Sequence, residues 1–247
     1  AGADLIIASR TEEKCVRAAE EIAKEYGVKA IGRGMDVRES SQVNSVFREA
    51  VGEMGGKLDI LVNNAAGNFY FPAEKLRDKL WLAVIEIDLN GTFYCSRAAF
   101  KYMKDNGGSI VSITSNLQKD GWVGMAPATS AKGGIDALTK TLALEWARFG
   151  IRVNAISPGP IVTEGVSKAF EKGTNFEDET LINSVPLRRT GKPEEIGNTA
   201  VFMCSEMGSW MTGATIILDG GEAISPVRAM PTPEQLEAEL ANRKKKD

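Results

Sequence analysis

No histidine occurs among the 247 residues, and this absence decides which reactions the side chains can carry out. A Ser-His-Asp or Cys-His nucleophile and an HExxH zinc site are excluded. Any proton transfer has to use an aspartate, a glutamate, a lysine, a tyrosine or water. The three cysteines, Cys15, Cys95 and Cys204, lie far apart without a CxxC pair. They are typical of reduced thiols in an intracellular protein, and we expect no metal site.

A hydroxyl and two cations follow the first apolar run of the chain, residues 4–8. A carboxylate at the end of such a strand would accept hydrogen bonds from a ribose 2′-OH, as NAD binding requires. Here Ser9 and Arg10 stand at that place, and Lys14 follows one helical turn later. A guanidinium binds a phosphate in a bidentate manner, so the pattern predicts NADPH, with Arg10 and Lys14 near its 2′-phosphate. The alternative is a solvated cation, which opposes the helix dipole at a helix start.

Two loops of small or rigid residues leave later strands: Asn64, Ala65, Ala66 and Gly67, and Pro158, Gly159, Pro160 and Ile161. The first loop lets backbone approach a flat ligand at the carboxyl end of a strand, where α/β sheets bind ligands. The second loop forms a rigid corner whose exposed backbone donors suit a carboxamide. Each alone could be an ordinary tight turn or a plain rigid loop. Together they favour a nicotinamide ring that lies across the edge of the sheet.

The elements that must position these residues follow from the hydrophobic pattern. Short runs rich in Ile, Val and Leu predict strands at 4–8, 30–35, 60–62, 109–113, 152–156 and 215–218. Helical patterns between them predict helices at 12–26, 40–54, 80–93, 96–104, 129–149 and 194–204, of which the third and fourth form one long helix or a closely joined pair. This alternation, with right-handed crossovers, predicts an α/β fold with an open, doubly wound parallel sheet.

The length, with 43% hydrophobic and 26% charged residues, fits one large α/β domain over residues 1–247. The 30 Lys and Arg against 33 Asp and Glu give a net charge of −3, which argues against a nucleic-acid partner. The sequence contains no apolar run of about 18 residues, so no membrane span is predicted. The tail, residues 225–247, has the pattern of a docked helix with a charged, frayed end.

The front of the sequence lacks one unit. A nucleotide-binding βαβ unit begins with a strand and a Gly-rich turn, and we expect it to begin about 30 residues before Ala1–Asp4. No G-x-G-x-x-G occurs anywhere in the sequence. We therefore expect that the complete protein has an upstream strand and Gly-rich turn, so that this domain is N-terminally truncated.

Several local motifs occur in one order with consistent spacing, and they are specific only jointly. They are Asn63–Gly67, Ser115, Thr129–Gly134 and Asn154–Thr163, together with Ala8–Arg10, Asp36–Arg38, Asn64–Phe69 and Leu218–Glu222. With these motifs the sequence resembles the short-chain dehydrogenase/reductase family, which has a Rossmann-like fold, over essentially its whole length except that family's first strand and helix. The closer resemblance is to the 2,4-dienoyl-CoA reductases, and it rests on Ala8–Arg10, Asp36–Arg38, Asn64–Phe69, Pro158–Ile161 and Leu218–Glu222.

The catalytic centre departs from the broad family pattern. Most members place a tyrosine four residues before the active-site lysine, which corresponds to Lys132, and that position is Ala128 here. One branch of the dienoyl-CoA reductases places a tyrosine where this chain has Leu117. The chain instead resembles the peroxisomal type, which has an Asp-x-x-Gly-Thr-Phe run and no catalytic tyrosine.

The resemblance assigns roles to the remaining polar groups. Asp88 is expected to pair with Lys132 and to hold a water that protonates the substrate, while Lys132 also holds the nicotinamide ribose. Asn90 matches a residue that binds the thioester carbonyl in the tyrosine-bearing branch, and Ser115 is a further catalytic candidate. The alternative for Asp88 is a polar helix residue bonded to backbone.

The resemblance also implies the reaction and its partners: NADPH-dependent reduction of 2,4-dienoyl-CoA to 3-enoyl-CoA in unsaturated fatty-acid oxidation. The residues expected at the adenine are Asp36 and Val37, and those at the acyl-CoA thioester are Arg10, Arg38, Phe69 and Lys168, with the stretch 77–79. A homotetramer in a peroxisome or mitochondrion is implied as well. Two alternatives stay open: another short-chain enoyl or carbonyl reductase, and a catalytically silent nucleotide-binding scaffold.

Overall fold

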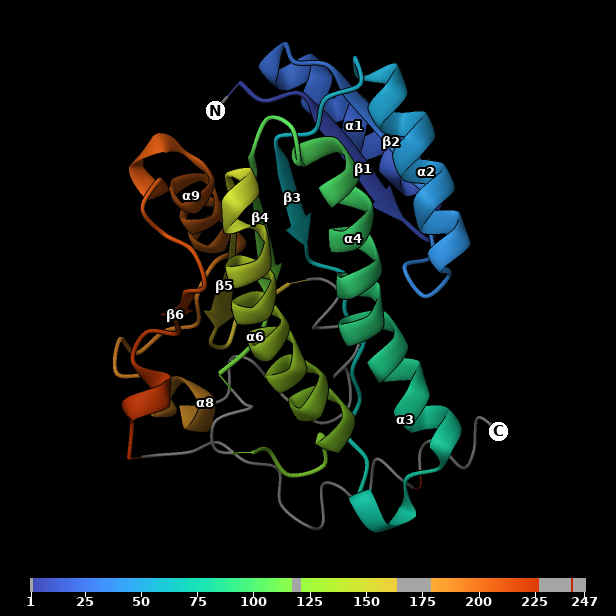
Figure 1. Cartoon of the computed structure of the whole chain (residues 1–247). Helices are drawn as coiled ribbons and strands as arrows, with labels where there is room; N and C mark the ends of the chain where they lie inside the picture. Colours follow the sequence, from blue (N-terminus) through green and yellow to red (C-terminus); the bar gives the residue numbers. More distant parts are fainter. Residues whose placement is uncertain (1, 117–120, 164–178, 227–240, 242–247) are drawn as a thin grey trace.

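The computed structural model describes residues 2–116, 121–163, 179–226 and 241. Strands and helices alternate along the chain, with helices on both faces of the strands (Figure 1). The strands are β1 (Leu5–Ser9), β2 (Ala30–Gly34), β3 (Ile60–Asn63), β4 (Gly108–Ile113), β5 (Ile151–Pro158) and β6 (Thr215–Leu218). The helices are α1 (Glu12–Tyr26), α2 (Ser40–Glu53), α3 (Asp78–Ile85), α4 (Gly91–Met103), α6 (Ala126–Trp146), α8 (Glu179–Ser184) and α9 (Pro193–Cys204). No helix in this part of the chain is long and apolar enough to cross a membrane.

All strand pairs of the described residues are parallel, which confirms the predicted α/β fold. They form two sheets: one has the order β1-β2 and the other the order β3-β4-β5-β6. The register pairs Leu5 with Ala30 in the first sheet and Ile60 with Ser109 in the second. No described strand joins β1 to β3.

The helices differ from the sequence prediction by more than one residue at two places, and α8 was not predicted. Residues 78–103 form the expected closely joined pair, α3 and α4, but the junction is a π-helical turn, η2 (Glu86–Asn90), and does not lie between 93 and 96. Hydrophobic periodicity does not detect a π turn, because one extra residue leaves the apolar pattern on either side unchanged. The predicted helix 129–149 is α6 followed by a short 3-10 turn, η3 (Ala147–Phe149), and α6 begins earlier because Pro127 suits a first turn.

A large apolar core lies between the four-stranded sheet and helices α4 and α6. Ile110 of β4 and Val153 of β5 are fully buried there against Met103 and Trp146. The Trp146 ring also contacts the Phe100 ring, with 4.9 Å between the centroids. This core fixes the position of α6 on the sheet, and α6 carries Lys132.

Helix α2 connects the two sheets by packing against α4. Met35 and Val43 share a buried cluster with Cys95 and Ala98 of α4. At the surface of the same contact, the Arg97 guanidinium donates to the Ser40 hydroxyl over 3.0 Å. The β1-β2 sheet is therefore held beside the larger sheet through helices on one face.

The contact between α1 and β2 depends on a glycine. A Cβ atom at Gly32 would lie 2.2 Å from the backbone nitrogen of Val16 in α1. Atoms cannot approach so closely, so any side chain at this position would push α1 away from the strand.

We expect Gly32→Ala to lower the free energy of unfolding by about 1–3 kcal/mol, because the added methyl group overpacks this contact. Gly52→Ala in α2 is the matched control, since nothing lies within 4 Å of a Cβ there. Alanine inside a helix is favoured over glycine by roughly 0.5–1 kcal/mol, so the control should be slightly stabilised. Urea unfolding of both variants gives the two values. A Gly32→Ala protein as stable as the parent would contradict the close approach of α1 to β2.

Candidate active site

A buried carboxylate and a partly buried ammonium meet at the carboxyl end of the four-stranded sheet. Asp88 lies in the π turn between α3 and α4 and is 1% exposed. Its Oδ2 atom is 3.4 Å from Nζ of Lys132 in α6. Its Oδ1 atom accepts a hydrogen bond of 2.8 Å from the backbone N–H of Gly67. The structure thus brings together Asp88, Lys132 and the small-residue loop that follows β3.

The Lys132 ammonium has a second partner in the sheet. Its Nζ donates to the carbonyl oxygen of Ile113, the last residue of β4, over 3.0 Å. The carbonyl of Lys132 in turn accepts from the Thr114 hydroxyl over 3.1 Å. These contacts hold the lysine between the end of β4 and the π turn.

The protonation of Asp88 reflects its surroundings. Burial raises the pKa of the Asp88 carboxyl above its usual range, although the Lys132 ammonium and the Gly67 N–H act to lower it. A carboxyl with a raised pKa beside an ammonium can hold a proton closer to neutral pH than an exposed aspartate. Carboxyl groups with a shifted pKa are frequent at functional sites, and π turns are as well.

A chain of buried hydrogen bonds connects the π turn to the ends of neighbouring strands. The Thr92 hydroxyl donates to the carbonyl of Asp88 over 2.6 Å, and the Ser96 hydroxyl donates to the carbonyl of Thr92 over 2.7 Å. The Asn63 side chain, at the end of β3, donates to the hydroxyls of Ser96 and Ser112. The network ties the position of Asp88 to strands β3 and β4.

The position that holds a tyrosine in most short-chain dehydrogenases is apolar. Ala128 is 5% exposed and belongs to a cluster with Val84 and Met125. Phe69 and Tyr70 pack against this cluster. Tyr70 therefore packs against the cluster that contains Ala128, although sequence reasoning assigned it no role. No sequence signal could reveal this, because a loop and a distant helix make the contact.

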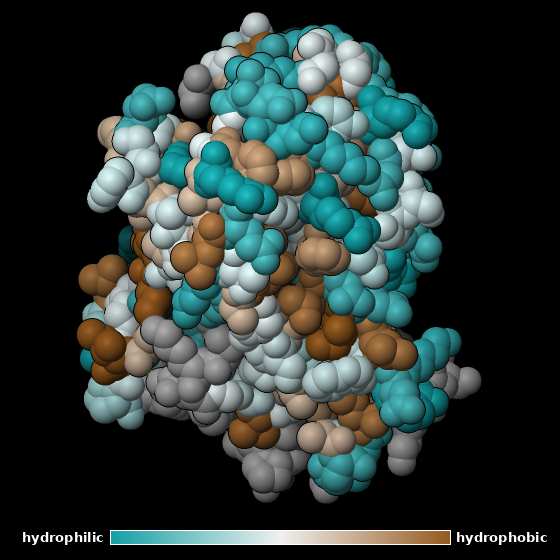
Figure 2. All heavy atoms as spheres, viewed as in Figure 1, coloured by the Kyte–Doolittle hydropathy of each residue, from teal (hydrophilic) through white to brown (hydrophobic). Residues whose placement is uncertain are grey.

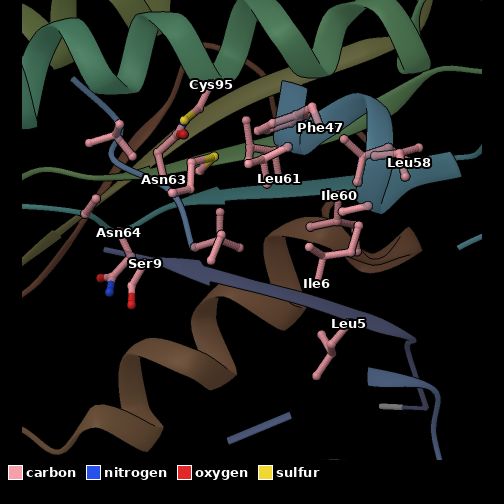
Figure 3. Close-up of a pocket in the computed structure, with 18 of the residues that line it drawn as sticks. Leu5, Ile6, Ser9, Phe47, Leu58, Ile60, Leu61, Asn63, Asn64 and Cys95 are labelled. Carbon is pink, nitrogen blue, oxygen red and sulfur yellow. The ribbon is translucent and has the colours of Figure 1, made fainter. Parts of the chain in front are cut away.

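A cavity of about 820 Å³ lies between β1 and β3. Five predicted cofactor residues line it: Arg10, Asp36, Val37, Asn64 and Ala65. Figure 3 shows Ser9 and Asn64 together at one end of this cavity, which is the carboxyl end of both strands. The remaining members of the predicted cofactor set lie outside it, and Lys14 is exposed on α1.

Asp36 and Arg38 bind each other in the structure. The Arg38 Nε donates to both carboxylate oxygens of Asp36 over 2.9 and 3.0 Å, and the Arg38 backbone N–H donates to Oδ1 over 3.0 Å. The guanidinium holds the pKa of Asp36 below its usual range. Arg38 was expected at the substrate and Asp36 at the adenine, but the two bind each other. Arg10, which lines the same cavity, is exposed and forms no ion pair with the described residues.

The corner 158–161 offers fewer donors than the sequence suggested. Pro158 and Pro160 have no N–H, and the N–H of Gly159 donates to the carbonyl of Leu218 in β6 over 3.1 Å. The expectation that Gly159 presents an exposed donor is therefore wrong, because this N–H completes the ladder between β5 and β6. Ile161 is the donor that this corner retains.

The other predicted site residues are distributed around the pair. Asn90 lies in the π turn two residues after Asp88, and Ser115 follows the end of β4. Phe69 lies in the loop after β3 and contacts Phe71 edge to face. Lys168 and Leu117 lie outside the described residues, as does most of the tail 225–247.

A buried polar cluster beside this end of the sheet was missed by sequence reasoning. The Asn116 side chain donates to Glu222 over 2.9 Å, and both are nearly fully buried. Asp219 accepts the backbone N–H groups of Gly221 and Ala223 over 2.8 and 2.7 Å. The sequence showed these acids only as part of the run Leu218–Glu222. Their burial could not be read from a polar, glycine-containing segment.

Three comparisons with known proteins bear on this site. The family model described as Enoyl-(Acyl carrier protein) reductase matches residues 1–222. A probable 2,4-dienoyl-CoA reductase, (2E)-enoyl-CoA-producing, from Bacillus subtilis (strain 168) is 45% identical over 196 residues, which cover 78% of this chain and 76% of that protein. The peroxisomal 2,4-dienoyl-CoA reductase, (3E)-enoyl-CoA-producing, of Danio rerio is 39% identical over 222 residues, or 89% of this chain and 73% of that protein.

The solved structures agree with the sequence relatives. The gluconate 5-dehydrogenase from Burkholderia cenocepacia J2315, in complex with NADP and tartrate, has a TM-score of 0.82 at 30% identity, covering 89% of this chain and 85% of that one. The family model, the relatives and this structural neighbour all extend over most of the chain. The chain therefore belongs to the short-chain dehydrogenase/reductase family of oxidoreductases.

Proposed function

We propose that this protein reduces 2,4-dienoyl-CoA thioesters with NADPH and yields 3-enoyl-CoA. The observation that carries the proposal is the buried Asp88–Lys132 pair, bound to Gly67 and set beside Ala128 where the family's usual tyrosine is absent. A reductase without that tyrosine needs another proton source, and this pair is one. The two reductase relatives named above support the substrate class.

The residues at the carboxyl ends of β1 and β3 fit a dinucleotide. Arg10 is exposed beside the cavity and suits a 2′-phosphate, with Lys14 nearby on α1. Asp36 and Val37 line the same cavity and suit the adenine, while Asn64 and Ala65 continue it toward the catalytic pair. A nicotinamide bound beyond them would supply a hydride. The NADP in the Burkholderia neighbour is consistent with this choice of cofactor.

The protein's own part in the reaction is to stabilise charge and deliver a proton. Hydride addition to the conjugated chain leaves negative charge on the thioester oxygen, and Asn90 and Ser115 are the proposed donors to it. Asp88 and the Lys132 ammonium orient a water whose proton goes to carbon, and the hydroxide regains a proton from the Asp88 carboxyl. Hydride plus proton then amounts to one two-electron reduction of the diene.

The position of the product double bond reports where that proton arrives. Addition of hydride to C5 followed by protonation at C2 leaves a 3-enoyl thioester, whereas protonation at C4 leaves a 2-enoyl thioester. The two relatives differ here, since one is named (2E)-enoyl-CoA-producing and the other (3E)-enoyl-CoA-producing. We propose protonation at C2, which the product's double-bond position measures directly.

The acyl-CoA is proposed to lie along the loop after β3. Phe69 offers an apolar surface, and the cations Arg10, Arg38 and Lys168 suit the CoA phosphates. Arg38 also binds Asp36 in the structure. The relatives differ in source, one being peroxisomal by name and another bacterial, so they favour no single compartment.

We also propose a homotetramer. Figure 2 shows apolar side chains on the face that carries α3, α4 and α6. Leu82 of α3 and Leu144 of α6 are among the exposed large apolar residues. Such surface is typical of subunit interfaces.

One observation favours the silent scaffold as a second candidate. Ala128 and its cluster leave no room for an ordinary catalytic tyrosine without repacking. Oxidation of NADPH in the presence of a 2,4-dienoyl-CoA separates the two candidates, since a scaffold would bind the cofactor without turnover.

The first test concerns the cofactor. Arg10→Ala should weaken NADPH binding by about 1.5–3 kcal/mol, the worth of a hydrogen bond to a charged group, and leave NADH binding nearly unchanged. Calorimetric titration of both cofactors measures the difference. Arg17 is an exposed cation of α1, three residues after Lys14, so Arg17→Ala controls for the loss of one positive charge. Equal weakening of both cofactors would contradict a 2′-phosphate contact.

The second test concerns proton delivery. Asp88→Asn keeps the shape and removes the charge, so turnover should fall by about 10²–10⁴-fold while NADPH affinity changes little. Lys132→Ala should lower both turnover and affinity, because the lysine is proposed to hold the ribose too. Steady-state assays and titrations give both quantities. Tyr70→Phe is the matched control for a hidden tyrosine acid: a large loss there, with Asp88→Asn still active, would transfer the role to Tyr70.

The third test uses the raised pKa of Asp88. A carboxyl whose pKa is higher in the folded than in the unfolded protein stabilises the fold below its unfolded pKa, near 3.8, and loses that contribution as pH rises through the folded pKa. The stability of the parent relative to Asp88→Asn should therefore fall as pH rises from 4 toward 7. Urea unfolding across this range measures it. A parent that gains on the variant with rising pH would mean that attraction to Lys132 outweighs burial.

A further inference from the structure

Ser115 lies on a short stretch of chain that continues beyond the end of β4. The pairing of β4 with β5 ends at Ile113, and the N–H of Thr114 donates to the carbonyl of Ile156 over 2.8 Å. Thr114 and Asn116 are each 3% exposed, whereas Ser115 between them is half-buried. The two neighbours of Ser115 are therefore fixed in the interior, while the Ser115 side chain stays accessible.

The two neighbours of Ser115 are bound to different parts of the molecule. The Thr114 hydroxyl donates to the carbonyl of Lys132 in α6 over 3.1 Å. The Asn116 side-chain amide donates to Oε2 of Glu222 over 2.9 Å and lies 3.4 Å from Oδ2 of Asp219. Thr114 thus connects this stretch to the helix that carries Lys132, and Asn116 connects it to the loop after β6.

The loop that binds the Asn116 amide is itself held in place. The Asp219 carboxylate accepts the backbone N–H groups of Gly221 and Ala223, and the Glu222 N–H donates to the Asp219 carbonyl over 3.2 Å. A Cβ atom at Gly159 would lie 2.7 Å from Asp219, so the corner after β5 packs directly on this loop. Hydrogen-bonded polar networks in the interior rigidify the structure around them, so the Asn116 amide has a fixed partner.

An asparagine suits this position because two acids meet on one side of it. Oxygen atoms of Asp219 and Glu222 both lie within 3.4 Å of the same Asn116 nitrogen. A side-chain amide supplies two N–H donors and carries no charge. A carboxylate at position 116 would repel both acids, and an apolar side chain would remove a donor from Glu222, which is 4% exposed.

We propose that Asn116 is a positioning residue: by binding Glu222 it holds Ser115 where the Ser115 hydroxyl donates to the thioester oxygen as negative charge develops there. This inference rests on the proposed function, in which Ser115 and Asn90 are the two donors to that oxygen. Misplacement of a catalytic group by about 1 Å costs roughly 10²-fold in rate. Loss of the contact between Asn116 and Glu222 should therefore slow the reaction through Ser115.

The test replaces both partners of the contact together. Asn116→Leu alone would take a donor from a buried acid, whereas Asn116→Leu/Glu222→Met removes both polar groups at similar volume, which is nearly neutral for stability. Urea unfolding verifies that this double variant is folded. With NADPH and 2,4-hexadienoyl-CoA, its kcat should fall about 100-fold. Its KM should stay close to that of the parent, because the Ser115 hydroxyl acts on charge that develops in the transition state.

A second background shows whether the effect passes through Ser115. Ser115→Ala lacks the hydroxyl, and Asn90 remains as a donor, so residual turnover is measurable. In this background the double replacement should lower kcat by no more than about two-fold, because there is no hydroxyl left to misplace.

Two further variants complete the test. Asn106→Leu is the matched control, since Asn106 is exposed in the turn before β4, at the opposite end of that strand from Ser115, and it should turn over like the parent. Asn116→Gln keeps both N–H donors and adds one methylene group. It should show the same dependence on the Ser115 hydroxyl, and it decides the matter if the double variant does not fold.

Two results would overturn this inference and leave the proposed function intact. One is a folded Asn116→Leu/Glu222→Met variant whose kcat equals that of the parent. The other is an equal loss of kcat in the parent and Ser115→Ala backgrounds, because the contact would then support the site as a whole and not Ser115. A parent that does not oxidise NADPH with 2,4-hexadienoyl-CoA is a different outcome, which overturns the proposed function together with the inference that rests on it.

Discussion

Asp88 and Lys132 place two charges out of water at the carboxyl end of the four-stranded sheet, and much of the surrounding structure serves to make this possible. Removal of each ion from water costs several kcal/mol, and the attraction between them offsets this only when their other hydrogen-bonding positions are filled. The Gly67 N–H fills one on the carboxylate, and the Ile113 carbonyl fills one on the ammonium. The loop after β3, the end of β4, the π turn and α6 are therefore held together by a single pair. The same desolvation raises the pKa of Asp88, the property on which its proposed role in proton delivery depends.

The π turn fits between β2 and α6 because two glycines allow a close approach. A Cβ at Gly91 would lie 2.7 Å from Val37, which follows β2, and a Cβ at Gly134 would lie 2.9 Å from the Leu89 side chain. A side chain at either position would displace the turn and with it Asp88. Val37 is also a proposed adenine contact. The proposed cofactor-binding residues and the proposed catalytic pair are thus connected through the packing around Gly91.

Local patterns were enough to predict most of the fold, because parallel strands buried on both faces are short apolar runs between punctuated helices. The strand 215–218 and the helix 12–26 have the predicted bounds, and the other strands differ by one to two residues at their ends. The π turn could not be predicted, since it changes backbone hydrogen bonding without changing residue type. The pairing of Asp88 with Lys132 was expected from the resemblance and is confirmed, but other contacts were not predicted. The binding of Arg38 to Asp36, the use of the Gly159 N–H by β6 and the burial of Glu222 all depend on tertiary neighbours. Asp88 and Lys132 came from resemblance, and only the structure gives the distance between them.

The interrupted sheet has a consequence for how the two halves of the site work together. Arg10 and Asp36 belong to the end of the β1-β2 sheet, whereas Asp88 and Lys132 belong to the four-stranded sheet. A ligand that spans both halves needs a fixed separation between them, and in the described residues that separation is set by α2 against α4 and by Val37 against Gly91, all helix-side contacts. The packing of α2 against α4 and of Val37 against Gly91 therefore sets the geometry of the proposed site.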